Sequence, residues 1–433
     1  AMRGMFEAAG YEIVDFKEMA DVYVVNTCTV TNIADRKSRQ MLHQAKSRNP
    51  KAIIAAVGCY VQAAEEVLVS DNAVDLVVGN NKKSDIVSMV ERCKSSKNKE
   101  ELVVNINDEI DYEELNVITT MEKTRAFIKI QDGCNRFCSY CIIPYVRGRV
   151  RSRKEEEVLQ EISELVKKGY QEIVLTGIHI SSYGTDFMKV EAETRPSEQE
   201  NCLENMPLAE LITKISKIDG VERIRLGSLE PRIITEEFLA AISQVRQFCP
   251  HFHLSLQSGS DTVLKRMNRK YSADEYYNRV IMIQKYFELP SFTTDIIVGF
   301  PGETQEEFNE TIQFVKKIGF FHIHVFKYSK RAGTKAADMP NQISEEMKNH
   351  RSNELIAISE IMSQEYKACF WGKIEKVLFE DKITIENKIY QVGHNERYLK
   401  IAVQCNNDLS NQIHQINICN NLTEEILLCE IIH

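Results

Sequence analysis

Short apolar runs alternate with amphipathic stretches in the first part of the chain, up to about residue 95. The runs Val22–Asn26, Ala52–Val57 and Val74–Val78 are separated by segments with helical spacing, such as Ala34–Ser47. Parallel strands need a crossover connection, and that connection is usually a helix. The alternation therefore predicts a small α/β domain with a parallel sheet over residues 1–100.

A second alternation of strands and helices runs through residues 120–365. Helical patterns long enough for right-handed crossovers separate six candidate strands, which are Phe127–Gln131, Ile173–Thr176, Ile224–Gly227, Phe252–Gln257, Thr294–Val298 and Ile323–Tyr328. Six such units predict a partial (β/α)6 barrel. The polar stretch Phe187–Asn205 lacks periodicity, which predicts a mobile loop inserted into one connection.

The chain changes character after a predicted helix at Ser344–Tyr366. Short alternating strands follow, with turn signals at Glu380-Asp381 and Gly393-His394-Asn395. This pattern is typical of a small antiparallel β-barrel, which we expect over residues 366–433. The fold class is therefore α/β in three parts, with a β-barrel at the carboxyl end.

Composition narrows the class of protein. A chain of 433 residues is long enough for several domains that each bury a core. It contains no run of roughly 18 apolar residues and no secretory signal series, so we expect a cytoplasmic protein without a membrane partner. Cysteines in a reducing compartment rarely pair as disulfides, and the twelve here are first considered as metal ligands.

The net charge of −9 argues against nucleic-acid binding, but the basic residues are unevenly distributed. Eight of them lie between Arg125 and Lys154 with a single acid, Asp132, among them. A second basic stretch runs from Arg36 to Lys51. Charge runs are usually only solvated faces, yet both stretches lie beside cysteine sites, so we expect them to contact phosphates.

Three cysteines, Cys134, Cys138 and Cys141, follow the first predicted strand of the central part with C-x3-C-x2-C spacing. Three thiolates from one loop can bind three irons of a [4Fe–4S] cluster and leave the fourth iron open for S-adenosylmethionine. A zinc site is the alternative, but structural zinc takes four protein ligands and the nearest downstream histidine is His179. The spacing favours the cluster.

The segment from Cys138 to Arg153, with its trailing arginines, resembles the cluster loop of the radical S-adenosylmethionine superfamily, and within it the methylthiotransferases. The resemblance covers nearly the whole chain. It implies an amino-terminal domain with an auxiliary [4Fe–4S] cluster, a radical barrel and a TRAM-type RNA-binding β-barrel. It also implies an electron donor protein and two uses of S-adenosylmethionine, as methyl donor and as radical source.

The same resemblance assigns contacts with S-adenosylmethionine at the ends of the barrel strands, where such folds bind ligands. Thr176-Gly177 looks like the contact with the amino group, and Glu230 looks like a ribose or carboxylate contact. Gln257 and Asp295 lie in later motifs that resemble those bordering the cofactor, and Tyr140 belongs to the cluster loop. The alternative for each position is a simple turn at a strand end.

Cys28 and Cys59 each follow a predicted strand of the first domain. Neighbouring parallel strands deliver such residues to one sheet edge, so the two thiols are candidate cluster ligands and sulfur-inserting residues, the alternative being two buried core residues. The family has a third cysteine after a preceding strand, and the sequence printed here begins at what looks like the following helix. Cys93 is a weak substitute because it lies in a helical pattern.

The substrate implied by the resemblance is tRNA, not DNA. Asn26–Gln40 and Ile142–Gly148 look most like the branch that acts on N6-threonylcarbamoyladenosine at position 37, and the isopentenyladenosine branch is the alternative. Gly393–Lys400 resembles a TRAM loop, although the residues from Cys369 onward carry more acids than bases. A hypothesis of another class is a non-catalytic RNA-binding protein with one cluster.

Overall fold

The computed structural model describes the chain except for residues 30, 97, 116–123, 188–205 and 433. The chain divides into two compact units. The first comprises Ala1–Thr120, Asp132–Arg151 and Ser329–Met339, and the second comprises Met121–Gln131, Ser152–Tyr328 and Pro340–His433. The predicted insert, from residue 188 onward, and Cys202 within it lie outside the described residues.

The first unit is built on a four-stranded parallel sheet, which confirms the predicted α/β class. Its order is β1-β2-β3-β4, with bounds Val22–Thr27, Ile53–Gly58, Leu76–Val78 and Glu100–Leu102. Residues of β2 alternate between two cores: Ile54 and Ala56 pack on one face, and Ala55 and Val57 on the other. Parallel sheets are covered on both faces, which explains why β2 is apolar throughout.

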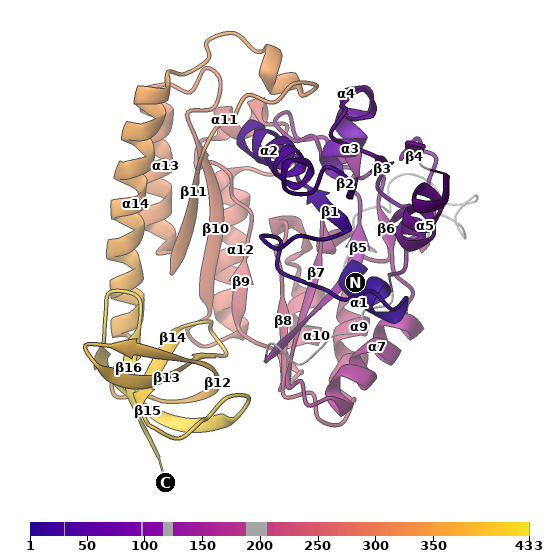
Figure 1. Cartoon of the computed structure of the whole chain (residues 1–433). Helices are drawn as coiled ribbons and strands as arrows, with labels where there is room; N and C mark the ends of the chain where they lie inside the picture. The colour runs from indigo at the N-terminus through magenta and orange to yellow at the C-terminus, as the bar shows by residue number, and fades with distance from the viewer. Residues whose placement is uncertain (30, 97, 116–123, 188–205, 433) are drawn as a thin grey trace. The chain divides into compact units, whose positions relative to one another are not determined.

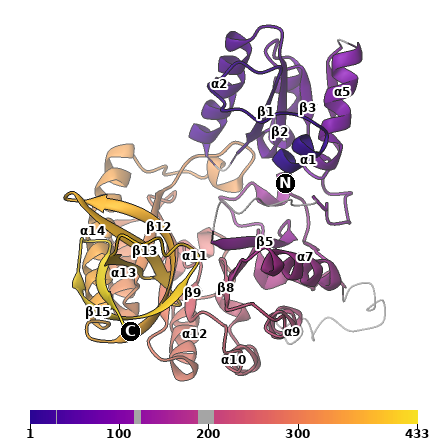
Figure 2. The same cartoon turned by 60° about the horizontal axis from the view of Figure 1, so that its bottom comes forward.

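Helices cover the two faces of this sheet (Figures 1 and 2). The helices α2 (Asn32–Arg48), α3 (Cys59–Ala63) and α4 (Glu65–Val69) supply the core on one face, and α1 (Met2–Ala8) and α5 (Ile86–Ser96) supply it on the other. Thr31 accepts a hydrogen bond from the Ala34 amide and thereby caps α2.

Six parallel strands form the half-barrel of the second unit, and each overlaps one of the six strands predicted from the sequence, although β9 is shorter than the predicted Phe252–Gln257 and begins one residue earlier. Their bounds are Arg125–Asp132 (β5), Glu172–Gly177 (β7), Arg223–Leu226 (β8), His251–His253 (β9), Ser291–Val298 (β10) and His322–Lys327 (β11). These strands belong to two sheets. One has the order β6-β5-β7-β8, in which β6 is Arg151–Ser152, and the other has the order β11-β10-β9. An isolated bridge between Leu229 and Leu254 connects the two sheets.

A single apolar core lies between these strands and their helices. The helices are α7 (Glu155–Lys167), α9 (Met206–Ile215), α10 (Glu236–Ser243), α11 (Asp261–Arg266), α12 (Ala273–Tyr286), α13 (Gln305–Ile318) and α14 (Glu345–Ala368). Capping boxes at Ser272/Glu275 and Thr304/Glu307 begin α12 and α13. Among the described residues, no helix combines the length and apolar character needed to cross a bilayer.

The carboxyl-terminal segment forms the expected small barrel, which is closed. Its order is β12-β13-β14-β16-β15, with bounds Ile374–Ile385, Lys388–Asn395, Lys400–Gln404, Leu427–Ile431 and Ile413–Asn421. All of these pairings are antiparallel except β14 with β16, which is parallel.

A buried ionic network connects this barrel to the start of the half-barrel strands. Glu172 at the start of β7 binds Arg225 at 2.7 Å and Arg223 at 3.5 Å. Arg223 also donates to the carbonyls of His394 and Lys376, both at 2.8 Å. Burial by itself would raise the pKa of Glu172, but the arginines reverse this and hold it below its ordinary value.

Removing the carboxylate of Glu172 leaves two buried guanidinium groups without their counter-charge. We expect Glu172→Gln to destabilise the protein by about 3 kcal/mol or more, measured by chemical denaturation. The stabilisation by Glu172 is present above the ordinary carboxyl pKa and is lost as the pH falls through the lowered value, so the variant should lack this acid-dependent loss. Glu346→Gln, which changes an exposed carboxylate on α14, is the control. Equal stability of the two variants would contradict a structural role for the network.

Candidate functional site

The structure brings Cys28 and Cys59 to the same edge of the first sheet. β1 and β2 pair in parallel with Thr27 opposite Gly58, so each cysteine is the next residue beyond a paired strand end. Gly58 has a φ of 103°, and a Cβ there would lie 2.9 Å from the Thr27 carbonyl oxygen. A side chain does not fit at this position, and glycine lets β2 turn directly into α3. Cys28 is exposed, and Cys59 is buried.

Two nitrogen donors surround the sulfur of Cys59. Arg147 Nε donates to Cys59 Sγ at 3.0 Å, and Asn80 Nδ2 lies 3.6 Å from the same atom. The Asn80 amide also donates to the Val146 carbonyl at 2.7 Å, so its position is fixed. A guanidinium group beside a sulfur stabilises its anionic form, which is the form that binds metal. The surroundings of Cys59 therefore fit a metal-bound thiolate better than an inert core residue.

Cys93 is placed differently from these two cysteines. Its Sγ lies 3.4 Å from the Asn98 carbonyl oxygen and 4.0 Å from that of Asp75, just before β3 begins. It is therefore at the amino end of the strands, whereas Cys28 and Cys59 are at the carboxyl end. Burial raises the pKa of the Cys93 thiol, and it raises that of Cys249 and Cys429 to about 12. These positions do not favour thiolate ligands.

Two of the arginines expected to bind phosphate are paired within the protein, Arg147 partly exposed and Arg151 buried. Arg147 lies 3.4 Å from Asp132, and Arg151, which is 1% exposed, lies 3.9 Å from it. Arg151 also donates to the Arg147 carbonyl at 2.9 Å. The expectation is therefore wrong for Arg151, because a buried cation that pairs with a carboxylate cannot also neutralise phosphate, whereas for Arg147 it stays a prediction. Arg149 is exposed and lies over the Phe137 ring.

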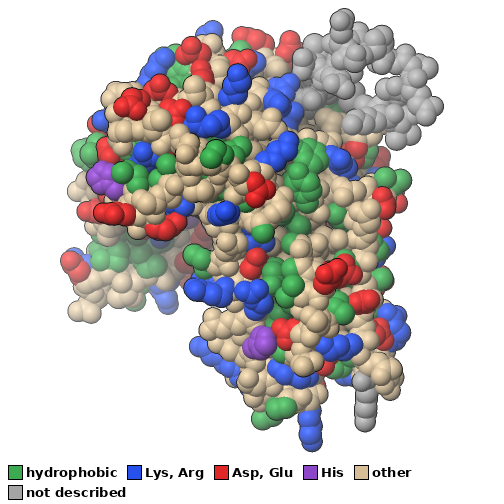
Figure 3. Space-filling model, turned by 90° about the horizontal axis from the view of Figure 1, so that it is seen from above, with side chains coloured by type: hydrophobic (Ala, Val, Ile, Leu, Met, Phe, Trp, Pro, Cys, Tyr) green, Lys and Arg blue, Asp and Glu red, His purple; other side chains and the backbone are tan. Residues whose placement is uncertain are grey.

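The exposed charges do not form a single block on the face drawn in Figure 3, where Lys and Arg side chains are interspersed with Asp and Glu side chains. This distribution agrees with a net charge of −9. A basic surface for RNA therefore has to be local. On α2, Arg36 and Lys37 are exposed at the start of the second basic stretch.

The triplet Cys134, Cys138 and Cys141 lies in a loop that directly follows β5, and all three residues are partly exposed. The Cys134 amide donates to the Gly148 carbonyl at 3.0 Å, and the Cys141 amide donates to the Cys138 carbonyl at 3.0 Å. A Cβ at Gly133 would lie 1.7 Å from the Arg149 carbonyl oxygen, so the loop is closed too tightly for a side chain there. Three accessible thiols in one braced loop fit the donor set of a three-thiolate cluster.

Tyr140 is partly buried within the same loop. The preceding residue, Ser139, accepts a hydrogen bond from the Ala336 amide at 2.8 Å. This contact ties the loop to the segment Ser329–Met339, which belongs to the same unit. The hydrogen bonds of Ser139 and Cys141, the residues on either side of Tyr140, therefore fix the backbone at this position.

In the second unit, His179 connects two of the predicted cofactor contacts. It follows Thr176-Gly177, and its Nε2 lies 2.8 Å from Glu230 Oε2. Its amide donates to Gln131 Oε1 at 2.7 Å. A Cβ at Gly177 would lie 2.9 Å from the Gln131 carbonyl oxygen, so this strand end packs without room for a side chain. Glu230 is buried and is thus fixed beside the end of β7.

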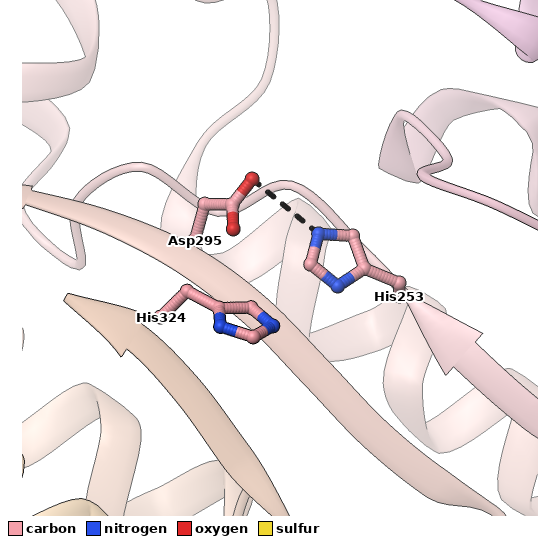
Figure 4. Close-up of side chains that lie close together, drawn as sticks. All are labelled: His253, Asp295 and His324. Atoms are coloured by element: carbon pink, nitrogen blue, oxygen red, sulfur yellow. Dashed lines mark ion pairs between the residues drawn. The ribbon is translucent and has the colours of Figure 1, made fainter. Parts of the chain in front are cut away.

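Gln257 and Asp295 lie on neighbouring strand segments. The Gln257 amide donates to the Asp295 carbonyl at 2.8 Å, and the Ile297 amide donates to the Gln257 carbonyl at 3.0 Å. Gln257 has a φ of 71°, a strained conformation for a residue with a side chain, and these bonds hold it there. The Asp295 side chain lies beside His253 and His324 (Figure 4).

Sequence reasoning missed several polar residues of these regions. It considered His179 only as a distant zinc ligand, and it assigned no role to Asn80, His253 or His324. The segments His251-Phe252-His253 and His322-Ile323-His324 did carry a signal. Residues two apart in a strand share a face, so each segment places two imidazoles side by side.

Comparison with known proteins places these features in a family. Residues 1–79 match the model described as uncharacterized protein family UPF0004, and residues 128–315 match the radical SAM superfamily. The chain is 39% identical to threonylcarbamoyladenosine tRNA methylthiotransferase MtaB of Bacillus subtilis, over 96% of this chain and 89% of the relative. It is 40% identical to MtaB of Aquifex aeolicus, over 90% of this chain and 91% of the relative.

A second group of relatives carries another name. The chain is 36% identical to tRNA-2-methylthio-N(6)-dimethylallyladenosine synthase of Thermoanaerobacter pseudethanolicus, over 91% of this chain and 83% of the relative. Among solved structures, the radical S-adenosylmethionine methyltransferase TsrM of Kitasatospora setae superposes with a TM-score of 0.53 at 12% identity, covering 78% of this chain and 68% of TsrM, which is a likeness of fold. The extent of the sequence identity shows that the chain is an enzyme of the radical S-adenosylmethionine tRNA methylthiotransferase family.

Proposed function

We propose that the enzyme converts N6-threonylcarbamoyladenosine at position 37 of tRNA to its 2-methylthio derivative. The observation that carries the proposal is the identity of 39–40% to two relatives named for this nucleoside, across at least 90% of the chain. The dimethylallyladenosine relatives are similar at 36% and define the alternative substrate. We also propose that the enzyme acts in the cytoplasm and receives electrons from a protein donor.

In this proposal, Cys134, Cys138 and Cys141 hold a [4Fe–4S] cluster, and Cys28 and Cys59 are the catalytic cysteines and two ligands of an auxiliary cluster. When bound, these groups supply the one-electron cleavage of S-adenosylmethionine and a place for the sulfur that is transferred. The residues assigned to S-adenosylmethionine are Tyr140, Thr176, Gly177, Glu230 and Gln257, whereas Asp295 lies in a motif that borders the cofactor and its side chain is available to the substrate.

The chain's own contribution is to position these groups and to set their charge. Gly133 and Gly177 leave no room for side chains, so backbone can approach closely at the cluster loop and at the end of β7. His179 holds the Glu230 carboxylate in one orientation. Arg147 neutralises anionic sulfur at Cys59 and is itself oriented by Asp132.

Replacing one ligand of the triplet should abolish radical generation. We expect Cys138→Ala to stop anaerobic cleavage of S-adenosylmethionine to 5′-deoxyadenosine, because a cluster on two thiolates should not persist. Chromatography of the nucleoside and iron counting after reconstitution measure this. Cys369→Ala, which changes an exposed cysteine far along the chain, is the control and should leave both readouts intact. Undiminished cleavage by Cys138→Ala would overturn the cluster assignment.

The two cysteine sites should separate by function. We expect Cys59→Ala in the reconstituted enzyme to retain most reductive cleavage but to lose the methylthio product, which mass spectrometry of digested tRNA detects. The control is Cys93→Ala, another buried thiol of the first unit at the opposite end of the strands. Full product from Cys59→Ala would show that Cys59 only packs in the core.

Phosphate contacts should come from exposed cations rather than from Arg151, which is buried, or Arg147, which pairs with Asp132. We expect Arg36→Ala, Lys37→Ala and Arg149→Ala combined to weaken tRNA binding and to flatten its salt dependence by up to about 0.9 log unit per lost contact. The charge-matched control changes Lys265, Lys285 and Lys316, which are exposed on helices of the second unit. If both triple variants gave the same slope as the wild type, the RNA would bind elsewhere.

A further inference from the structure

Three adjacent strands of the half-barrel place imidazoles and a carboxylate on one face. β10 pairs with β9 and β11, with Thr293 opposite His253 and Asp295 opposite His324. The alternating residues Leu254, Ile296 and Ile323 belong to the core beneath the helices. Because strand side chains alternate between faces, the polar set points away from the helices α12, α13 and α14.

The side chains of His253, Asp295 and His324 converge (Figure 4). His253 Nε2 lies 3.4 Å from Asp295 Oδ2, and each residue contributes one atom to a group whose members lie within 4.8 Å of one another. His253 Nδ1 lies 3.0 Å from Thr293 Oγ1, so both of its ring nitrogens face polar neighbours. The geometry fixes His253 between Thr293 and Asp295.

The cluster is accessible, unlike a core ion pair. His324 is exposed, and the Asp295 side chain is 30% exposed. Within the described part of the chain, neither ring nitrogen of His324 has a hydrogen bond. Partial burial lowers the pKa of His324 below its ordinary value and outweighs the neighbouring Asp295 carboxylate, which raises it. A neutral imidazole has one N–H to donate and one nitrogen to accept. The contacts of His324 in the structure are with the rings of His253 and His322.

We propose that this cluster recognises the threonyl part of the substrate: His324 donates to the threonyl carboxylate, and Asp295, oriented by His253, accepts from the threonyl hydroxyl. The inference rests on the proposed function and adds the residues that select the substituent. A dimethylallyl group is a hydrocarbon, so it would cover three polar side chains and leave them without hydrogen-bond partners. Leaving buried polar groups unpaired is a strong means of rejecting the wrong substrate.

A bound zinc ion is the competing occupant, because imidazoles and a carboxylate are common zinc ligands. Histidines that bind metal almost always donate their other ring N–H to a fixed acceptor, which sets the tautomer. His253 has such a neighbour in Thr293, but His324 has none among the described residues. The observations therefore favour the substrate, and zinc becomes an outcome of the test.

The test uses the reconstituted enzyme and two versions of an anticodon stem-loop RNA. One carries threonylcarbamoyladenosine, and in the other the threonyl carboxylate is converted to an amide. We expect the wild type to favour the acid by at least about 10-fold in kcat/KM, the range for one hydrogen bond to a charged group. His324→Ala should lose most of this preference by slowing more on the acid than on the amide, because the amide carbonyl accepts only a weaker, neutral hydrogen bond from His324. RNA-independent cleavage of S-adenosylmethionine should be preserved.

Two further variants keep the test decisive. His324→Asn retains an N–H donor and should recover part of the preference, which also covers a failure of the alanine variant to fold. His350→Ala, an exposed histidine on α14, should behave as the wild type.

The outcomes distinguish this inference from the proposed function. If His324→Ala kept the full preference for the acid while the wild type methylthiolated the RNA, the cluster would not recognise the carboxylate. If the wild type failed on threonylcarbamoyladenosine altogether, the proposed function itself would fail. If ZnCl2 bound the wild type but not His324→Ala, and its removal abolished activity on both RNAs equally, a metal site would replace this proposal.

Discussion

The register of parallel strands is the constraint on which the rest of the structure depends. In a parallel sheet every strand ends at the same edge, so residues far apart in the sequence become neighbours when their strands pair. Thr27 opposite Gly58 makes neighbours of the positions that follow them, Cys28 and Cys59. In the second unit the same rule brings Asp295 opposite His324. Helices cover both faces of the first sheet, which leaves its strand ends for chemistry, whereas the half-barrel also has a face without helices.

Several arginines pair with groups inside the protein. Arg147 donates to the sulfur of Cys59 and pairs with Asp132, while Arg223 and Arg225 surround Glu172 beneath the carboxyl-terminal barrel. A buried guanidinium group is tolerated only where carboxylates and carbonyls satisfy its donors. Arginines of this family member therefore bind a cysteine sulfur and anchor one structural element on another, and a count of basic residues overstates the basic surface available to RNA.

The motifs assigned to S-adenosylmethionine and the histidine cluster lie on strands of the same half-barrel. Thr176-Gly177 ends β7, whereas Asp295 and His324 lie within β10 and β11, and His253 is the last residue of β9, on the face opposite the helices. Changes at the cluster positions leave the core residues Leu254, Ile296 and Ile323 in place. The side chains of this cluster therefore do not support the fold.

Periodicity and cysteine spacing alone determined much of this protein. Local patterns predicted the parallel first sheet, the six half-barrel strands and the carboxyl-terminal β-barrel, because the spacing of apolar residues within each element indicates which of its faces is buried. The cysteine loop was recognisable because its three candidate ligands are close in sequence. Only the tertiary structure decided which side chains meet across distant segments. Arg147 looked like a phosphate contact until folding placed it against Cys59, and His324 had no visible role until β10 brought Asp295 beside it. Such contacts depend on strand register and on how the chain connects distant strands, which local sequence does not encode.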